Sequence, residues 1–113
     1  MAISAKDGSA LLSELTDDAV FISNLFDHRI EGRDAIVQAL HKIEALYKME
    51  AVAYRHRTLK REFIFANLIL TTGEGAEVMT VGVRDDSGWI CAMSMEHAPM
   101  SVVRTLRRQL QTA

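Results

Sequence analysis

The region from Glu50 to His97 constrains the fold most, because nearly all of it predicts strands that are apolar on both sides. Turn-forming segments at Lys60-Arg61, residues 73–75 and residues 85–88 divide this region into four strands. These strands cover about residues 51–59, 62–72, 76–85 and 89–97, and their short connections favour an antiparallel meander. A sheet with one face in water would alternate polar and apolar residues, and these strands do not.

The residues around this meander predict helices and one more strand. Gly32 precedes a helix at 33–48, whose apolar residues Ile36, Leu40, Ile43 and Tyr47 recur at helical spacing. A short helix before the strand at 19–23 and a closing helix at about 99–111 complete the pattern. The 113 residues suit one α+β domain, with its core at about 5–97 and a helical tail after it.

Two-residue turns centred on 60–61, 74–75 and 86–87 sort the strand side chains onto two faces. The smooth face collects Ala53, Ile64, Ala66, Leu68, Leu70, Met79, Val81, Val83, Ile90 and Ala92. The mixed face collects Tyr54, His56, Phe63, Phe65, Asn67, Ile69, Thr80, Trp89, Cys91, Met93 and Met95.

Both faces need cover, because burying one aliphatic side chain is worth about 1.5–3 kcal/mol and a single strong helix cannot shield two faces. We expect a second copy of the chain to pack on the smooth face and form a homodimer through the sheet. We expect the mixed face to curl around the 33–48 helix and enclose a pocket.

Composition narrows the function classes. The net charge of −2 argues against a nucleic-acid partner, and the single cysteine leaves no multi-cysteine zinc site. The four histidines lack HxH or HExxH spacing, so we expect neither a metal nor a cofactor. The first residues lack signal-peptide features and the longest apolar run, Phe63–Leu70, is too short for a membrane helix. A cytoplasmic protein without a membrane partner is the expectation.

Several polar side chains of the mixed face and its surroundings are candidates for chemistry. His56 and Tyr54 are two residues apart on one strand and could move a proton, although a core tyrosine and a satisfied or solvated histidine explain them more simply. Asn67 lies in an apolar run beside Phe65, where a ligand, a water molecule or a neighbouring side chain could satisfy its amide. Basic residues at 55–61 and 104–108 suit strand edges and a solvated helix face rather than an anion site.

Asp27 and His28 belong to a charged loop before the main helix, and they either contact a ligand or remain solvated. Trp89 and Met93 add bulky and flexible apolar groups to the mixed face. Such groups line pockets for flat hydrophobic ligands, and they also fill ordinary cores.

Three segments, LTDDAVFIS at 15–23, IEGRDAIVQAL at 30–40 and VGVRDDSGWICAM at 81–93, resemble the SnoaL-like branch of the nuclear transport factor 2-like (cystatin-like α+β) superfamily. The resemblance covers about residues 5–97 and implies a strongly curved antiparallel sheet wrapped around helices into a cone, in a protein that is often dimeric. It places the 27–31 loop near the pocket mouth. Members of the ketosteroid isomerase branch have carboxyl groups at two positions that fall near Ser23 and Thr80 of this chain. Neither residue is a carboxylate, which argues against proton abstraction by that arrangement.

The resulting hypothesis is a small-molecule-binding SnoaL-like protein, as a binder or as a cofactor-free isomerase, cyclase or dehydratase acting on an apolar or aromatic compound. In this hypothesis His56 and Tyr54 are catalytic, and Asn67, Phe65, Trp89, Met93, Asp27 and His28 bind the ligand. The alternative is a non-catalytic dimeric protein-interaction module whose cone is filled by its own side chains. The sequence leaves open whether the chain is an enzyme.

Overall fold

The computed structural model describes residues 13–112, which form six strands and two helices. In chain order these are β1 (Leu15–Ser23), β2 (Ile30–Glu31), α2 (Arg33–Glu44), β3 (Tyr47–Arg57), β4 (Arg61–Leu70), β5 (Gly75–Arg84), β6 (Ile90–Ala98) and α3 (Met100–Thr112). Residues 1–12, where most of the expected first helix falls, lie outside the described residues. Leu15 opens β1 as a buried strand residue.

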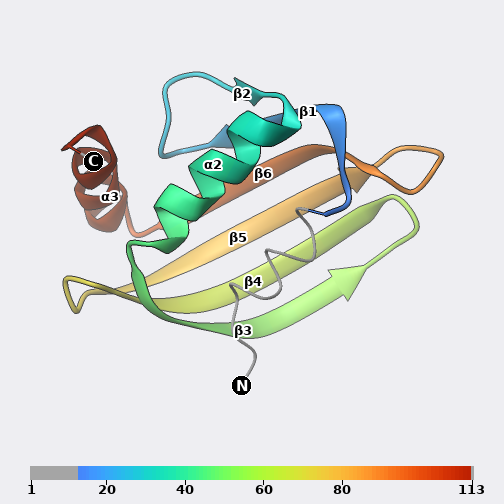
Figure 1. Ribbon diagram of the computed structural model, residues 1–113. Helices are drawn as coiled ribbons and strands as arrows, with labels where there is room; N and C mark the ends of the chain where they lie inside the picture. The colour runs from blue at the N-terminus through green and yellow to red at the C-terminus, as the bar shows by residue number, and fades with distance from the viewer. Residues whose placement is uncertain (1–12, 113) are drawn as a thin grey trace.

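All six strands belong to one sheet in the order β2-β1-β6-β5-β4-β3. Strands β3 to β6 form the predicted antiparallel meander. The sheet is mixed rather than wholly antiparallel, because β1 runs parallel to β6 beside it. The curved sheet with α2 across one face confirms the expected α+β class (Figure 1).

Helix α2 covers the side of the sheet that we call the inner face, and the opposite side is the outer face (Figure 1). Gly32 begins the helix with φ of 99°, which a residue with a side chain rarely adopts, and its N–H donates to Ala19 O at 2.8 Å. The buried helix residues Ile36, Leu40 and Ile43 join the inner-face side chains in one apolar core. From the meander this core takes Ile64, Ala66, Leu68, Leu70, Ala76, Val78, Ile90, Met93 and Met95.

The helix was predicted to cover the mixed face of the sheet, and this prediction is wrong. The β4 residues of the smooth face are the ones that α2 covers, and Tyr54, His56 and the β4 residues of the mixed face lie on the outer face. Met79 was assigned to the smooth face but pairs with Phe65 on the outer face, whereas Met93 was assigned to the mixed face and is buried on the inner face.

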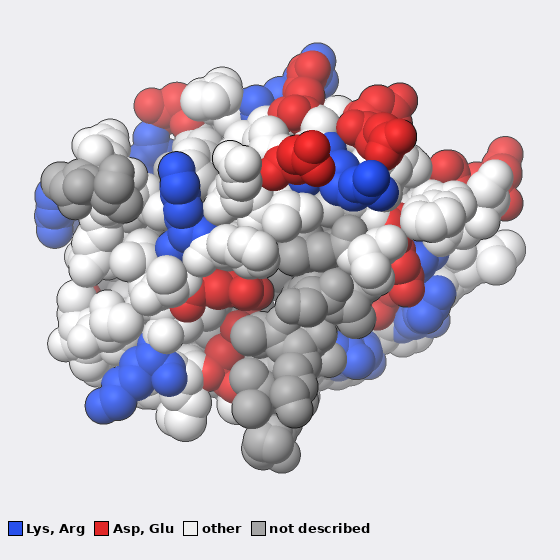
Figure 2. Space-filling view, in the orientation of Figure 1, with Lys and Arg blue, Asp and Glu red and all other residues white. Residues whose placement is uncertain are grey.

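The closing helix is confirmed as α3, which follows Pro99 and lies beside the end of β6 (Figure 1). The backbone N–H groups of Val102 and Val103 donate to Pro99 O, and both side chains are buried together with Leu106. No helix among residues 13–112 is long and apolar enough to cross a membrane. On the side of the molecule that carries α2, acidic and basic side chains are interspersed rather than gathered into one basic field (Figure 2).

Candidate functional site

Buried polar side chains gather on the inner face of the sheet. Those of the described chain that are almost fully buried are Ser23, Glu62, Thr80, Arg84 and His97. A buried polar group without a partner costs about 1–3 kcal/mol of folding free energy. The partners of these groups therefore show which parts of the fold are organised by polar contacts.

The most unusual of these groups is His97, at the end of β6, which is 4% exposed. Its Nε2 lies 2.5 Å from the hydroxyl oxygen of Tyr47, the first residue of β3. Burial lowers the pKa of His97 from 6.5 to about 4, so the ring is neutral at pH 7. Burial also raises the pKa of Tyr47, with the nearby carboxylates of Glu50 and Glu44 adding to the effect. The pair is therefore an uncharged phenol–imidazole contact at neutral pH.

The second ring nitrogen of His97 makes this pair incomplete. Nδ1 is buried and has no hydrogen-bond partner. If Nδ1 carries the proton, the Tyr47 hydroxyl donates to Nε2 and a buried N–H is left unpaired. If Nε2 carries it, the ring donates to Tyr47 and the hydroxyl proton of Tyr47 is free to donate elsewhere. Either tautomer leaves at least one polar group of the pair available to a further partner.

Asn24 fixes the backbone around His97. The Asn24 side-chain amide donates to His97 O at 2.8 Å, and His97 N donates to Asn24 Oδ1 at 3.0 Å. Arg107 of α3 donates through Nη1 to Asn24 O at 2.9 Å and through Nη2 to Asp27. Asn24 therefore joins the end of β6, the loop after β1 and helix α3.

A second polar cluster lies at the other end of the inner face, around Arg84 of β5. Its guanidinium donates to Glu62 at 2.8 Å, forms an ion pair with Glu14 at 2.6 Å and donates to Gly88 O at 2.8 Å. Arg84 and Glu62 are both buried, and Arg84 Nε has no hydrogen-bond partner. The cluster ties the β5–β6 turn to β4 and to the residue before β1, which is a structural role.

The loop after β1 and helix α3 enclose a hollow of about 240 Å³. Apolar walls come from Leu25 and Phe26 of the loop and from Leu110 of α3. The remaining lining residues are Asp27, His28, Arg107 and Gln111. The hollow thus combines an apolar surface with one guanidinium that is held in place by two contacts.

The structure brings Asp27 and His28 to the wall of this hollow, and both side chains are exposed. Asp27 forms an ion pair with Arg107, whose side chain is much less exposed than the carboxylate. Arg107 was predicted to be a solvated residue of the closing helix, so this contact is new. The sequence signal for this contact is the helical spacing of Arg107 from Val103 and Leu110, which places Arg107 at the edge of the apolar stripe of α3.

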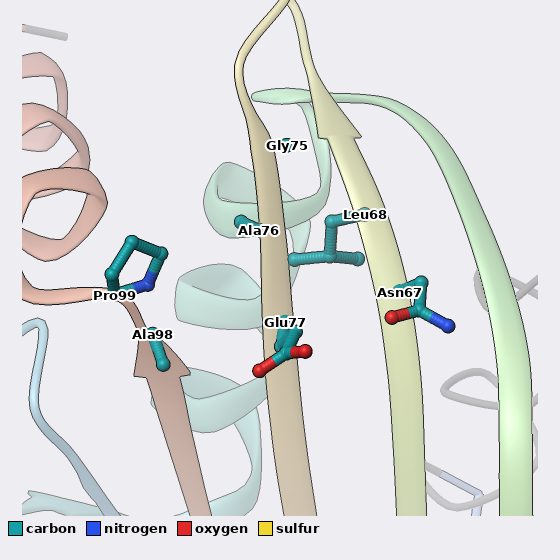
Figure 3. A pocket seen from close by; sticks show the side chains of 7 residues that line it. All are labelled: Asn67, Leu68, Gly75, Ala76, Glu77, Ala98 and Pro99. Carbon is teal, nitrogen blue, oxygen red and sulfur yellow. The ribbon is translucent and has the colours of Figure 1, made fainter.

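The predicted catalytic residues lie elsewhere, on the outer face. Tyr54 is 58% exposed, and its ring stacks on the exposed His56 at a centroid distance of 6.4 Å. Phe65 pairs with Tyr54 across the strands. Asn67 is exposed beside Glu77, so the expected buried amide does not occur (Figure 3).

Trp89 and Met93 do not join these groups. Trp89 is exposed in the β5–β6 turn, where its N–H donates to Asp85 Oδ1 at 3.0 Å. Met93 is buried against Gly82 and Phe21 on the inner face. The expected single pocket is therefore divided between the outer face, the inner core and the loop. The sequence did not single out Tyr47, Asn24 or Arg84 as site residues, and it placed Arg107 on a solvated helix face.

The curved sheet with helix α2 across one face is the nuclear transport factor 2-like, or cystatin-like, fold. An uncharacterized protein with a cystatin-like fold from Silicibacter pomeroyi DSS-3 is similar with a TM-score of 0.85 at 15% identity, covering 98% of this chain and 78% of the other. A steroid delta-isomerase from Pseudomonas aeruginosa gives 0.83 at 18% identity, with coverages of 96% and 80%.

A nuclear-transport-factor-2-like protein of unknown function from Burkholderia xenovorans LB400 is similar over 88% of this chain and 80% of the other, at 18% identity and a TM-score of 0.65. No family model matches the chain, and no curated protein matches its sequence. At these identities the similarity establishes the fold, and the function has to be argued from the site.

Proposed function

We propose that this protein binds a small molecule with an aromatic or aliphatic body and one anionic group in the hollow between the loop after β1 and α3. The observation that carries the proposal is Arg107, whose guanidinium stands at the wall of a hollow of about 240 Å³ beside the apolar side chains of Leu25, Phe26 and Leu110. Apolar walls with a few placed polar groups are the usual composition of a small-molecule site.

The Asp27 carboxylate pairs with the Arg107 guanidinium, and a ligand anion can replace this carboxylate at low cost. The Asp27 side chain is 84% exposed, so water solvates its carboxylate when the ion pair opens. An exposed ion pair is worth up to about 1 kcal/mol, whereas a charge-assisted hydrogen bond that is shielded from water is worth about 1.5–3 kcal/mol. Exchange of Asp27 for a ligand anion against the apolar wall is therefore favourable.

The space between α2 and the sheet does not compete for the ligand within the described residues. The side chains of Ile36, Leu40 and Ile43 lie there in one apolar core with inner-face side chains of β4 and β5, and they are almost fully buried. That filling supports part of the alternative hypothesis, an interaction module with a filled cone. Because there is a hollow at α3, ligand binding is proposed ahead of this alternative.

Acid–base catalysis is the second candidate, and the Tyr47–His97 contact favours it over the outer-face pair of Tyr54 and His56. A neutral imidazole that holds a phenol can relay a proton to a substrate at the hydroxyl. Ser23 and Thr80 provide buried hydroxyl groups, not carboxyl groups, on the inner face. We therefore expect that the protein does not turn over a β,γ-unsaturated ketosteroid above background. If it does, and if Tyr47→Phe abolishes that turnover, the protein is a catalyst rather than a binder.

Two fluorescent probes of matched shape test the binding proposal. Anilinonaphthalene sulfonate carries an anion on an aromatic body, and N-phenylnaphthylamine has the same body without the anion. We expect Arg107→Gln to weaken binding of the sulfonate at least ten-fold and to change binding of the neutral probe less than about two-fold, because only the anion uses the guanidinium. Asp27→Asn removes the competing carboxylate and should tighten binding of the sulfonate.

Arg104→Gln is the matched control, because Arg104 is an exposed arginine of the same helix outside the hollow. Equal losses of the sulfonate in both arginine variants would show nonspecific attraction to the basic helix. No binding of either probe to the folded wild-type protein would contradict the proposal.

A further inference from the structure

The polar side chains that line the hollow at α3 differ in what they can offer a ligand. Asp27 can only accept hydrogen bonds, whereas Arg107, His28 and Gln111 all carry N–H groups that donate them. Among residues 13–112, the side chains of His28 and Gln111 form no hydrogen bond or ion pair. The hollow therefore presents two donor groups with no partner in the described chain, beside the guanidinium of Arg107.

These three donors come from two parts of the chain that the fold holds against each other. Arg107 and Gln111 are four residues apart on α3, so their side chains lie on the same side of the helix. His28 belongs to the loop after β1, and Arg107 ties this loop to α3 by donating to Asn24 O at 2.9 Å. A ligand in the hollow therefore meets donors from the helix and from the loop at once.

We infer that the anionic group of the ligand is a tetrahedral oxyanion with one negative charge, as in a sulfonate or a sulfate ester. Such a group has three terminal oxygen atoms, so Arg107, His28 and Gln111 can each donate to a different one. A carboxylate has only two oxygen atoms, and one of the three donors stays without an acceptor. This inference rests on the ligand site proposed above and names the chemical class of its ligand.

The charges around the hollow favour one negative charge on the ligand over two. Arg107 supplies one positive charge, and the displaced Asp27 carboxylate stays on the wall of the same hollow. Helix α3 ends at Thr112, directly after Gln111, and the free carbonyl groups of a last helical turn carry partial negative charge. A phosphate monoester carries about −1.5 to −2 charges at pH 7, so both repulsions act on it more strongly.

Three ligands built on one ring system test this class by calorimetric titration of the full chain at pH 7 and constant ionic strength. They are 2-naphthalenesulfonate, 2-naphthoate and 2-naphthyl phosphate. We expect the sulfonate to bind at least five-fold more tightly than the carboxylate, because it uses one more donor. We also expect it to bind more tightly than the phosphate. Inorganic sulfate should not compete with it, because sulfate lacks the apolar body.

Two variants test the assigned donors. Gln111→Met and His28→Phe each remove one donor from an exposed side chain, so neither change disturbs the core. Each should weaken the sulfonate at least three-fold and change the carboxylate less than about two-fold, because two donors remain for its two oxygen atoms. The control is Arg108→Gln, an exposed arginine of α3 outside the hollow, which should leave the ratio of the two affinities unchanged.

Asp27→Asn tests the limit on charge. This variant removes the carboxylate that opposes a second negative charge, so it should tighten the phosphate more than the sulfonate. A phosphate that binds wild type more tightly than the sulfonate does would overturn the single charge.

The remaining outcomes separate this inference from the proposed function. Equal wild-type affinities for the sulfonate and the carboxylate, both weakened by Arg107→Gln, would overturn the tetrahedral class and leave the ligand site standing. A preference for the sulfonate that survives both Gln111→Met and His28→Phe would overturn the assigned donors. Failure of all three ligands to bind the folded protein would overturn the ligand site itself.

Discussion

Protonation of His97 provides the sharpest test of the inner site. Its pKa in the folded chain is about 4, because burial disfavours the charged ring, and its usual value is 6.5. A group with a lowered folded pKa contributes stability that is complete above 6.5 and is lost as the pH falls toward 4. A difference of 2.5 pH units corresponds to about 3 kcal/mol of unfolding free energy lost between pH 7 and pH 4.

Neighbouring groups partly oppose this loss. Burial raises the pKa of Glu44 in the folded chain, although His41 lowers it, so protonation of Glu44 favours the native state as the pH falls. Tyr47 and Glu50 also face the site, but Tyr47 is neutral throughout this range because its pKa is raised. The contribution of His97 is therefore obtained by comparing two proteins that share all the other groups.

The comparison is urea unfolding of wild type and His97→Gln at several pH values between 4 and 7.5. Gln keeps a polar side chain near Tyr47 but does not titrate, so its unfolding free energy should lack about 3 kcal/mol of the wild-type decrease. The variant is expected to be less stable than wild type at pH 7 and to approach it at pH 4. Parallel pH profiles for the two proteins would refute the burial of a neutral His97.

Two further perturbations test the framework around the sites. Glu62→Ala should lower the unfolding free energy by about 3 kcal/mol in chemical denaturation, because it leaves the buried Arg84 with one carboxylate fewer. Its control is Asp86→Ala, which breaks an exposed pair with a lysine and should leave the denaturation midpoint nearly unchanged. Gly32→Ala should cost about 1–3 kcal/mol in the same assay because its φ is 99°; Gly75→Ala, at a position with open space and no positive φ, should not be destabilising. Equal effects within either pair would contradict the corresponding reasoning.

Local patterns predicted the elements well because each carries its own signal. Gly32 before a run of apolar residues at helical spacing marks the start of α2, and Pro99 marks the boundary of α3. The end of α2 was predicted at Lys48 and lies at Glu44, since no glycine, asparagine or proline marks the turn at Ala45. The parallel pairing of β1 with β6 depends on residues about 70 positions apart, which no local pattern encodes.

One turn explains why residues of β5 and β6 were assigned to the wrong face relative to β4. A two-residue turn at Glu74-Gly75 was assumed, whereas the structure pairs Ile69 with Gly75 and places the positive φ at Gly73. The shift is an odd number of residues, and an odd shift moves every following side chain to the other face. Tyr54 and His56 kept their expected neighbours on β4, but the face they share is the outer one.

The candidate site was only partly predictable for a related reason. Asp27 and His28 were expected near a pocket mouth, and they line a hollow. The partner that gives this hollow its chemistry, Arg107, is about 80 residues away in the chain. Its role emerges only when α3 is placed against the loop after β1.

A heteronuclear NMR titration of the uniformly labelled protein with anilinonaphthalene sulfonate locates the ligand site directly. We expect saturable shifts concentrated at amides 24–28 and 106–111 around the hollow, with little change at 61–67 on the outer face. Shifts concentrated on β3 and β4 around Tyr54 and His56 would contradict the proposed location. Shifts that never saturate would contradict a defined site.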